Sequence, residues 1–362
     1  MPAALSSCIE RIRAAAAAGT PLRLRGGGSK DFYGERLVGA VLDTRELAGI
    51  RSYEPSELVV TVGAGTPLAQ LESVLAENGQ ALAFEPPHFG GEPTVGGMVA
   101  AGLSGPSRAS AGAVRDHVLG LSLVNGKGEL LTFGGQVMKN VAGYDVSRLV
   151  VGALGTLGLI VEVSLKVLPR APAEATLRFE LPQARALEHL HAWGGRPLPL
   201  NASCWVEEAG TGLLYLRLRG ARAAVDAACR ALGGERIEDG QATCDWTLCR
   251  DQQLPWFADR ASQDLWRLSV PQATPVLDLP GPVLVEWHGA QRWVAAAPGD
   301  AERLRRVAEA AGGHATLFRA GAHAFAQRFH PLQPPLDRIH RELKRQFDPA
   351  GIFNRGRLYP DL

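Results

Sequence analysis

The chain has 362 residues, of which 46% are hydrophobic and 21% charged, and its formal net charge is +1. This length allows two domains, and the composition is typical of a globular protein. The nearly balanced charge disfavours a nucleic-acid binder or a membrane-surface protein. The longest strongly apolar run, residues 149–161, is too short to span a bilayer, so we expect a cytoplasmic chain that reaches a membrane only through a partner.

The five cysteines are scattered, and none forms a CxxC pair. An odd number without paired spacing indicates reduced thiols. Cys244 and Cys249 lie closest together, but an iron–sulfur cluster would need further cysteines. We expect no metal site.

The first 65 residues predict one helix and three strands. The Ala-rich stretch 3–18 predicts the helix, and apolar, β-branched segments closed by turn residues predict strands at 21–26, 37–44 and 57–65. Thr66 and Pro67 predict the start of a second helix, with Thr66 as its N-cap and Pro67 at the first helical position.

A glycine-rich stretch at 89–112 precedes a predicted hairpin at 117–133, which turns at Asn125-Gly126. One more strand is predicted at 159–169. After Arg170 the glycine clusters largely stop, and strands mix with amphipathic helices. This pattern predicts an α+β fold with a domain boundary near residue 170.

The segment "VVTVGAGTPL" has most of a dinucleotide-binding fingerprint, because Gly63 and Gly65 follow a strand and Glu85 lies further on. Leu68 replaces the third glycine, however, and a loop and a hairpin follow where a Rossmann fold would alternate strands and helices. The sequence therefore disfavours a Rossmann fold.

Three glycine clusters remain, at 26–28 before Ser29 and Lys30, at 90–112, and at 152–158. Packing or a tight turn explains any one cluster. Glycine at this density also exposes backbone N–H groups that can converge on an anion. Three such clusters within the first 160 residues fit one long ligand such as a dinucleotide.

Five stretches then occur in a characteristic order: "RGGGSKD", "PTVGGMVAAGLSGPSRASAGAVRDHVLGLSLVNGKGELLTFG", "KNVAGYD", "GALGTLGLIVEVSLKVLP" and "FDPAGIFNRGRLYP". This set resembles the FAD-linked oxidases of the vanillyl-alcohol oxidase/p-cresol methylhydroxylase type, most closely the E subunits of bacterial glycolate oxidases. The resemblance implies an α+β protein with a two-part FAD-binding domain of the p-cresol methylhydroxylase type at 1–170 and an antiparallel-sheet cap domain at 171–330. A C-terminal segment at 331–362 would return to the flavin.

The resemblance also implies which residues hold FAD. They are Arg25, Gly26, Gly27, Gly28, Ser29, Lys30, Pro93, Thr94, Gly96, Gly97, Met98, Ala100, Gly102, Ser104, Gly105, Gly112, Arg115, Asp116, Val118, Gly155, Thr156, Gly158, Ile160 and Asn354. Many relatives carry a histidine in the loop that matches "RGGGSKD" and bond it covalently to the flavin. That histidine is absent here, which implies noncovalent FAD.

The resemblance further implies a glycolate oxidase complex with a catalytic flavoprotein D subunit and an iron–sulfur F subunit. Catalytic relatives carry a histidine pair in a Gly-Asp-Gly-rich motif, which this sequence lacks. The candidate catalytic residues are Tyr144, Glu286 and His288, and on one strand Glu286 and His288 would share a face. Two alternatives stay open: a self-sufficient FAD oxidoreductase on another small substrate, and a non-catalytic scaffold.

Overall fold

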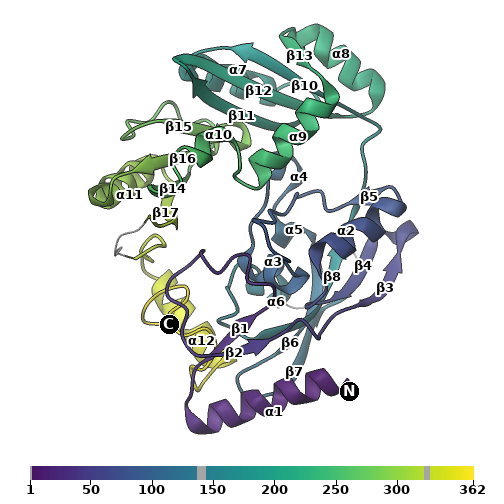
Figure 1. Cartoon of the computed structure of the whole chain (residues 1–362), viewed down its shortest axis with the longest axis vertical. Helices are drawn as coiled ribbons and strands as arrows, with labels where there is room; N and C mark the ends of the chain where they lie inside the picture. Colours follow the sequence, from purple (N-terminus) through teal and green to yellow (C-terminus); the bar gives the residue numbers. More distant parts are fainter. Residues whose placement is uncertain (1, 137–143, 322–326) are drawn as a thin grey trace. The chain divides into compact units, whose positions relative to one another are not determined.

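The structure is a computed structural model that describes residues 2–136, 144–321 and 327–362 (Figure 1). The chain divides into two compact units. Unit 1 consists of residues 1–103, 113–170 and 331–362, and unit 2 of residues 104–112 and 171–330. The segment 104–112 therefore clusters with unit 2, although its sequence neighbours on both sides belong to unit 1.

Unit 1 is built on a five-stranded sheet in the order β3-β4-β8-β6-β7, in which every neighbouring pair is antiparallel. Its strands are β3 (Ile50–Glu54), β4 (Val59–Gly63), β6 (Val118–Val124), β7 (Leu130–Gly134) and β8 (Leu159–Lys166). An antiparallel sheet excludes a Rossmann fold, whose strands are parallel. Two small pairs complete the strands: β1 (Leu22–Arg25) with β2 (Ala40–Asp43), and β5 (Gln80–Ala81) with β9 (Leu168–Pro169).

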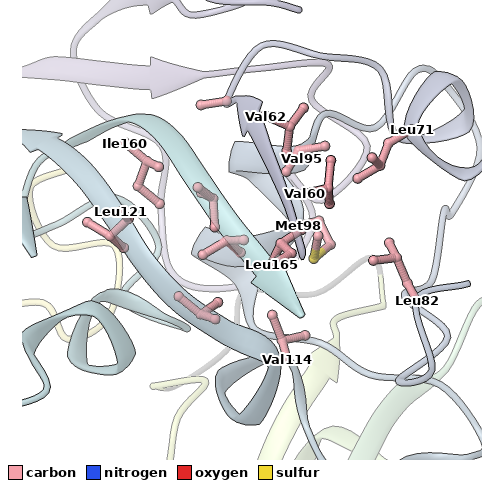
Figure 2. Close-up of a cluster of buried hydrophobic side chains, with 14 of the residues drawn as sticks. Val60, Val62, Leu71, Leu82, Val95, Met98, Val114, Leu121, Ile160 and Leu165 are labelled. Carbon is pink, nitrogen blue, oxygen red and sulfur yellow. The ribbon is translucent and has the colours of Figure 1, made fainter. Parts of the chain in front are cut away.

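The helices of unit 1 are α1 (Ala3–Ala18), α2 (Leu68–Glu77), α3 (Val95–Ala101), α5 (Val114–His117), α6 (Val146–Val150) and α12 (Leu336–Phe347). Side chains of α2, α3 and the sheet form one apolar core, in which Figure 2 shows Met98 of α3 beside Val60 of β4 and Leu165 of β8. Each of these three side chains is fully buried. This core fixes α3, and with it the glycine-rich turn that leads into the helix.

Two local predictions in unit 1 need correction. The helix α2 begins at Leu68 without a side-chain cap, and the Thr66 hydroxyl instead accepts a hydrogen bond from Gly49 N at 2.9 Å. The hairpin β6–β7 is present, but its loop is longer than a two-residue turn. The Asn125 side-chain oxygen accepts from the backbone N–H groups of Lys127 and Glu129, which organises a loop over residues 125–129.

Unit 2 carries an eight-stranded sheet in the order β13-β10-β12-β11-β15-β16-β14-β17, and its paired strands are antiparallel. The strands are β10 (Ala173–Glu180), β11 (Leu200–Glu208), β12 (Thr211–Gly220), β13 (Glu235–Ile237), β14 (Asp264–Ser269), β15 (Val283–Glu286), β16 (Gln291–Ala296) and β17 (His314–Arg319). The helices are α4 (Arg108–Ala111), α7 (Gln183–Gly194), α8 (Arg222–Leu232), α9 (Asp239–Arg250), α10 (Pro255–Ala258) and α11 (Ala301–Ala310).

The two faces of this sheet have different neighbours. Leu214 and Leu216 of β12 pack in one apolar cluster with side chains of α7 and α8. Successive strand residues point to opposite faces, so Tyr215 and Arg217 face the other side. There the guanidinium of Arg217 lies 4.8 Å from the ring centre of Trp246, which belongs to α9. The helices α7 and α8 thus cover one face of the sheet and α9 covers the other.

Across the described residues, every helix is too short or too polar to cross a lipid bilayer.

Candidate functional site

The loop that follows β1 exposes a row of backbone donors. Within the described residues, no group accepts a hydrogen bond from the backbone N–H of Gly26, Gly27, Gly28 or Ser29. Consecutive unpaired N–H groups form a concave site for an anion. The Ser29 hydroxyl lies 3.1 Å from Lys30 Nζ, which places an ammonium at the end of this row.

The three glycines are required by contacts with the protein itself. A Cβ on Gly27 would lie 1.6 Å from the carbonyl oxygen of Glu92, and one on Gly26 would lie 2.1 Å from Thr94 Oγ1. Gly28 has a positive φ of 77°. The glycines therefore allow this loop to lie directly against the residue 92–94 turn that leads into α3. This close packing brings the first two glycine clusters together.

Positive side chains surround the loop. Arg23 Nη2 and Arg25 Nε both bind Asp31 Oδ2, at 3.1 and 2.9 Å, so one carboxylate orients two guanidinium groups. Arg357, from the C-terminal segment, is almost fully buried and donates hydrogen bonds to the carbonyl oxygens of Lys30, Asp31, Tyr33 and Glu35. With Lys30, these charges give the loop the positive field that a pyrophosphate requires.

Two adjoining hollows in unit 1 start from this loop. They share Leu24, Arg25, Gly26, Gly97, Ala100, Leu154 and Asn354. One continues along Gly27, Gly28, Ser29, Lys30 and Thr94. The other continues along Thr44, Ala64, Gly96, Gly155, Gly158 and Ile160. Together they make one groove that touches all three glycine-rich regions of the sequence, as an extended ligand would require.

The C-terminal segment forms hydrogen bonds to residues on both sides of the groove. Asn354 accepts a hydrogen bond from Leu24 N at 2.8 Å and donates one to the Leu154 carbonyl at 2.6 Å. Lys344 Nζ donates to the carbonyl oxygens of Thr156 and Phe353. Residues more than 180 positions apart in the sequence are thereby held at one place.

Other residues that the resemblance implied for FAD do not line these hollows. Met98 and Val118 lie in the apolar core, Thr156 bonds the Ala153 carbonyl, and Asp116 accepts from Ala113 N. Six further residues implied for FAD also lie outside the lining of the two hollows: Pro93, Gly102, Ser104, Gly105, Gly112 and Arg115. Conversely, the sequence analysis missed Leu24, Thr44, Ala64, Leu154 and Arg357, which line the groove without a local motif.

Comparison with known proteins agrees with this geometry. Residues 1–134 match the family described as FAD binding domain. The chain is 46% identical over 354 residues to the glycolate oxidase subunit GlcE of Escherichia coli (strain K12), covering 98% of this chain and 97% of that protein. The chain belongs to the GlcE family.

Two further matches are more distant. The glycolate oxidase subunit GlcD of Bacillus subtilis (strain 168) is 33% identical over 140 residues, which cover 38% of this chain and 29% of that protein. An alkyldihydroxyacetonephosphate synthase structure aligns with 96% of this chain and 74% of its own, with a TM-score of 0.65 and 15% identity. The predicted α+β fold, with an FAD-binding domain of the p-cresol methylhydroxylase type and an antiparallel-sheet cap, is confirmed.

This GlcE-family chain is therefore an FAD-linked oxidoreductase flavoprotein, and its predicted cofactor is confirmed as FAD. The groove suits that cofactor, because the unpaired N–H groups of Gly26 to Ser29 match a pyrophosphate. Bound FAD supplies a two-electron acceptor for substrate oxidation. In the described parts of the chain, no three His, Cys, Asp or Glu side chains form a group that could hold a metal ion.

The catalytic candidates do not form one constellation. Tyr144 is 99% exposed, and the preceding residues 139–143 of its motif lie outside the described residues. The expectation that Glu286 and His288 share a strand face is wrong, because β15 ends at Glu286. His288 lies in the following turn with φ of 54°.

Glu286 and His288 also have separate partners. Glu286 is buried and accepts hydrogen bonds from Cys249 Sγ, Gln291 Nε2 and Trp293 Nε1, at 3.3, 3.0 and 2.5 Å. Burial raises the pKa of its carboxyl, although these hydrogen bonds oppose the shift. These three donors of the protein enclose the carboxyl group, so Glu286 is an internal hydrogen-bond acceptor of unit 2.

His288 fastens the segment 104–112 to the sheet of unit 2. Its Nε2 lies 3.0 Å from Ser110 Oγ, and its Nδ1 and backbone N lie 3.2 and 2.9 Å from Ser203 Oγ. The neighbouring Trp287 donates from Nε1 to the Gly105 carbonyl at 3.0 Å. Both Trp287 and His288 have φ of 54°, a conformation that non-glycine residues adopt only when the surrounding contacts hold them there.

The buried His288 ring should make stability depend on pH. Burial lowers the pKa of His288 from 6.5 to about 4. Between these two values the unfolded chain binds the proton and the folded chain does not, so stability is lost as pH falls through this window, by roughly 3 kcal/mol at most. We expect His288→Gln to remove most of that loss in urea unfolding followed over this range. His191→Gln, at an exposed position of α7, is the control. An unchanged acid slope in His288→Gln would contradict the assignment.

Proposed function

We propose that this chain is the FAD-binding subunit of a 2-hydroxy-acid oxidase complex, in which glycolate is oxidised to glyoxylate and the electrons pass through FAD to a partner. The observation that carries the proposal is 46% identity to GlcE along almost the full length of both chains. Because the match covers 97% of GlcE, it relates the two proteins along their whole length. The match to GlcD covers 29% of that protein and therefore relates only a part of it to this chain.

The chemistry of the reaction supports a role in a complex. Removing two electrons and two protons from glycolate needs a base for the hydroxyl proton and cations for the carboxylate. In the described residues of unit 2, His288 is bonded on both ring nitrogens and Glu286 is enclosed by donors. Neither is arranged as a free base. We therefore propose that a catalytic flavoprotein D subunit supplies the substrate site and an iron–sulfur F subunit takes up electrons.

The residues of unit 1 have a different task in this proposal. The N–H groups of Gly26 to Ser29 and the charges of Arg25 and Lys30 hold the phosphates of FAD. The Asn354 contacts keep the loop and the residue 154–155 turn at a fixed separation. This arrangement binds the cofactor noncovalently and leaves the redox chemistry to FAD.

The test is reconstitution with the D and F subunits of glycolate oxidase. We expect Gly27→Ala in this chain to leave the three-subunit complex assembled but to lower glycolate-dependent dye reduction at least about tenfold, since electrons then lack one flavin. Full activity with this flavin absent would show a scaffold instead. Glycolate turnover by the isolated chain would show a self-sufficient oxidoreductase.

A further inference from the structure

A second cavity lies within unit 2, separate from the groove of unit 1. Its volume is about 520 Å³, which lies in the range of small-molecule sites. Side chains from the sheet face opposite α7 and α8, and from α9 and α10, line it: Thr176, Cys204, Val206, Glu207, Glu208, Ala209, Tyr215, Ile237, Ala242, Asp245, Trp246, Cys249, Leu254, Pro255, Trp256, Asp259 and Arg260. No part of the proposed function uses it.

The cavity is also distinct from the His288 cluster. Cys204 of β11 lines the cavity, whereas its neighbour Ser203 binds His288. Adjacent residues of a strand point to opposite faces of the sheet. The two sites therefore lie on opposite sides of β11.

The walls of the cavity are apolar and aromatic. Trp246 and Trp256 are buried. The guanidinium of Arg217 lies over the ring of Trp246, and the guanidinium of Arg260 lies over the ring of Trp256. The Trp246 indole is fixed by a hydrogen bond from Nε1 to Thr176 Oγ1 at 2.9 Å. Rigid aromatic walls of this kind suit a ligand with an apolar body.

The charges of the lining are predominantly negative. The lining residues include four acidic residues, Glu207, Glu208, Asp245 and Asp259, and one arginine, Arg260. Of these carboxylates, only Asp245 has a hydrogen-bond partner among the described residues, the Gln241 amide at 2.8 Å. Arg178 stands opposite Tyr215 in the sheet and pairs with Glu235 at 2.5 Å, so this ion pair adds no net charge near the cavity.

Two of these carboxylates, those of Glu208 and Asp245, act electrostatically on the hydroxyl group of Tyr215. Burial raises the pKa of the Tyr215 hydroxyl, and the negative charge of Glu208 raises it further. The guanidinium of Arg178 opposes this shift, and Asp245 adds a smaller increase. In the described chain no group forms a hydrogen bond with this hydroxyl, although Tyr215 lines the cavity. An ammonium bound here would donate to the hydroxyl oxygen and face both carboxylates.

We propose that this cavity binds an organic cation, an amine carried on an apolar or aromatic body. The aromatic walls would take the body of the ligand, and Tyr215, Glu208 and Asp245 would take its ammonium. A 2-hydroxy acid does not fit, because its carboxylate would meet a lining with a surplus of negative charge. The site is therefore a second ligand site, independent of the oxidised substrate.

Calorimetric titration of the full-length holoprotein tests the proposal with tryptamine, 2-phenylethylamine and hexylamine as probes, and with indole-3-propionate as an anion of the same body as tryptamine. We expect at least one amine to bind at least about tenfold more tightly than the anion. Glu208→Gln combined with Asp245→Asn should weaken that amine about tenfold, because two partly exposed charge pairs are lost.

The matched control combines Glu188→Gln with Asp226→Asn, which makes the same change in net charge at exposed positions of α7 and α8, on the opposite face of the sheet. We expect this control to bind amines as the wild type does. Binding of amine and anion with equal affinity, equal weakening in the control, or no binding of any of the three amines at millimolar concentration would each overturn the proposal.

Discussion

Gly27→Ala is expected to weaken FAD binding at least about 100-fold, so that the chain purifies without its yellow colour. The added Cβ would lie 1.6 Å from the carbonyl oxygen of Glu92, a backbone atom that no rotamer change can move. The loop must then separate from the residue 92–94 turn, and the row of N–H groups from Gly26 to Ser29 loses its alignment. Fluorescence titration of the apoprotein with FAD measures the effect.

Gly135→Ala is the matched control, because a Cβ on Gly135 would meet no atom within 4 Å. Its affinity for FAD should equal that of the wild type. If Gly27→Ala kept wild-type affinity, the loop at 26–28 would not be the phosphate site. A circular dichroism spectrum and a thermal melt of each variant separate loss of cofactor from loss of fold.

Lys344→Met is expected to lower the free energy of unfolding by about 3–5 kcal/mol, the largest effect of any single change considered. Lys344 Nζ lies 2.7 Å from Asp348 Oδ2, and the Asp348 carboxylate has no solvent exposure. Removing the ammonium leaves this charge buried without a counterion and leaves the carbonyl oxygens of Thr156 and Phe353 without their donor. Urea unfolding of the apoprotein measures the loss.

The neighbouring Arg345 provides the comparison. It forms an exposed ion pair with Glu342 at 2.8 Å on the same helix. Surface pairs of this kind contribute little, so Arg345→Met should cost less than about 1 kcal/mol. Equal losses in the two variants would mean that Lys344 does not anchor the C-terminal segment.

The sequence predicted those parts of the groove that arise from local patterns. The glycines at 26–28 are such a feature, because they and the Ser29 and Lys30 that follow are neighbours in the sequence. The physical reason for the glycines differs, however. They accommodate the Glu92 carbonyl and Thr94, and only through that packing do they present donors to an anion.

Arg357 could not be predicted from any local pattern. Its guanidinium holds carbonyl oxygens that lie between 322 and 327 positions earlier in the chain. The turn at His288 was missed for a similar reason. An alternating pattern predicts that a strand continues, but contacts with Ser110 and Ser203 hold His288 in a left-handed conformation. Tertiary contacts override local propensity at both positions.

The absorption spectrum of the purified chain, recorded before and after anaerobic addition of glycolate, tests the central claim most directly. We predict a flavin spectrum with one noncovalent FAD per chain, which stays oxidised with glycolate until the D subunit is added and then bleaches. A correctly folded chain that purifies without flavin, and binds none when FAD is added, would contradict the claim that this protein is the FAD-binding subunit.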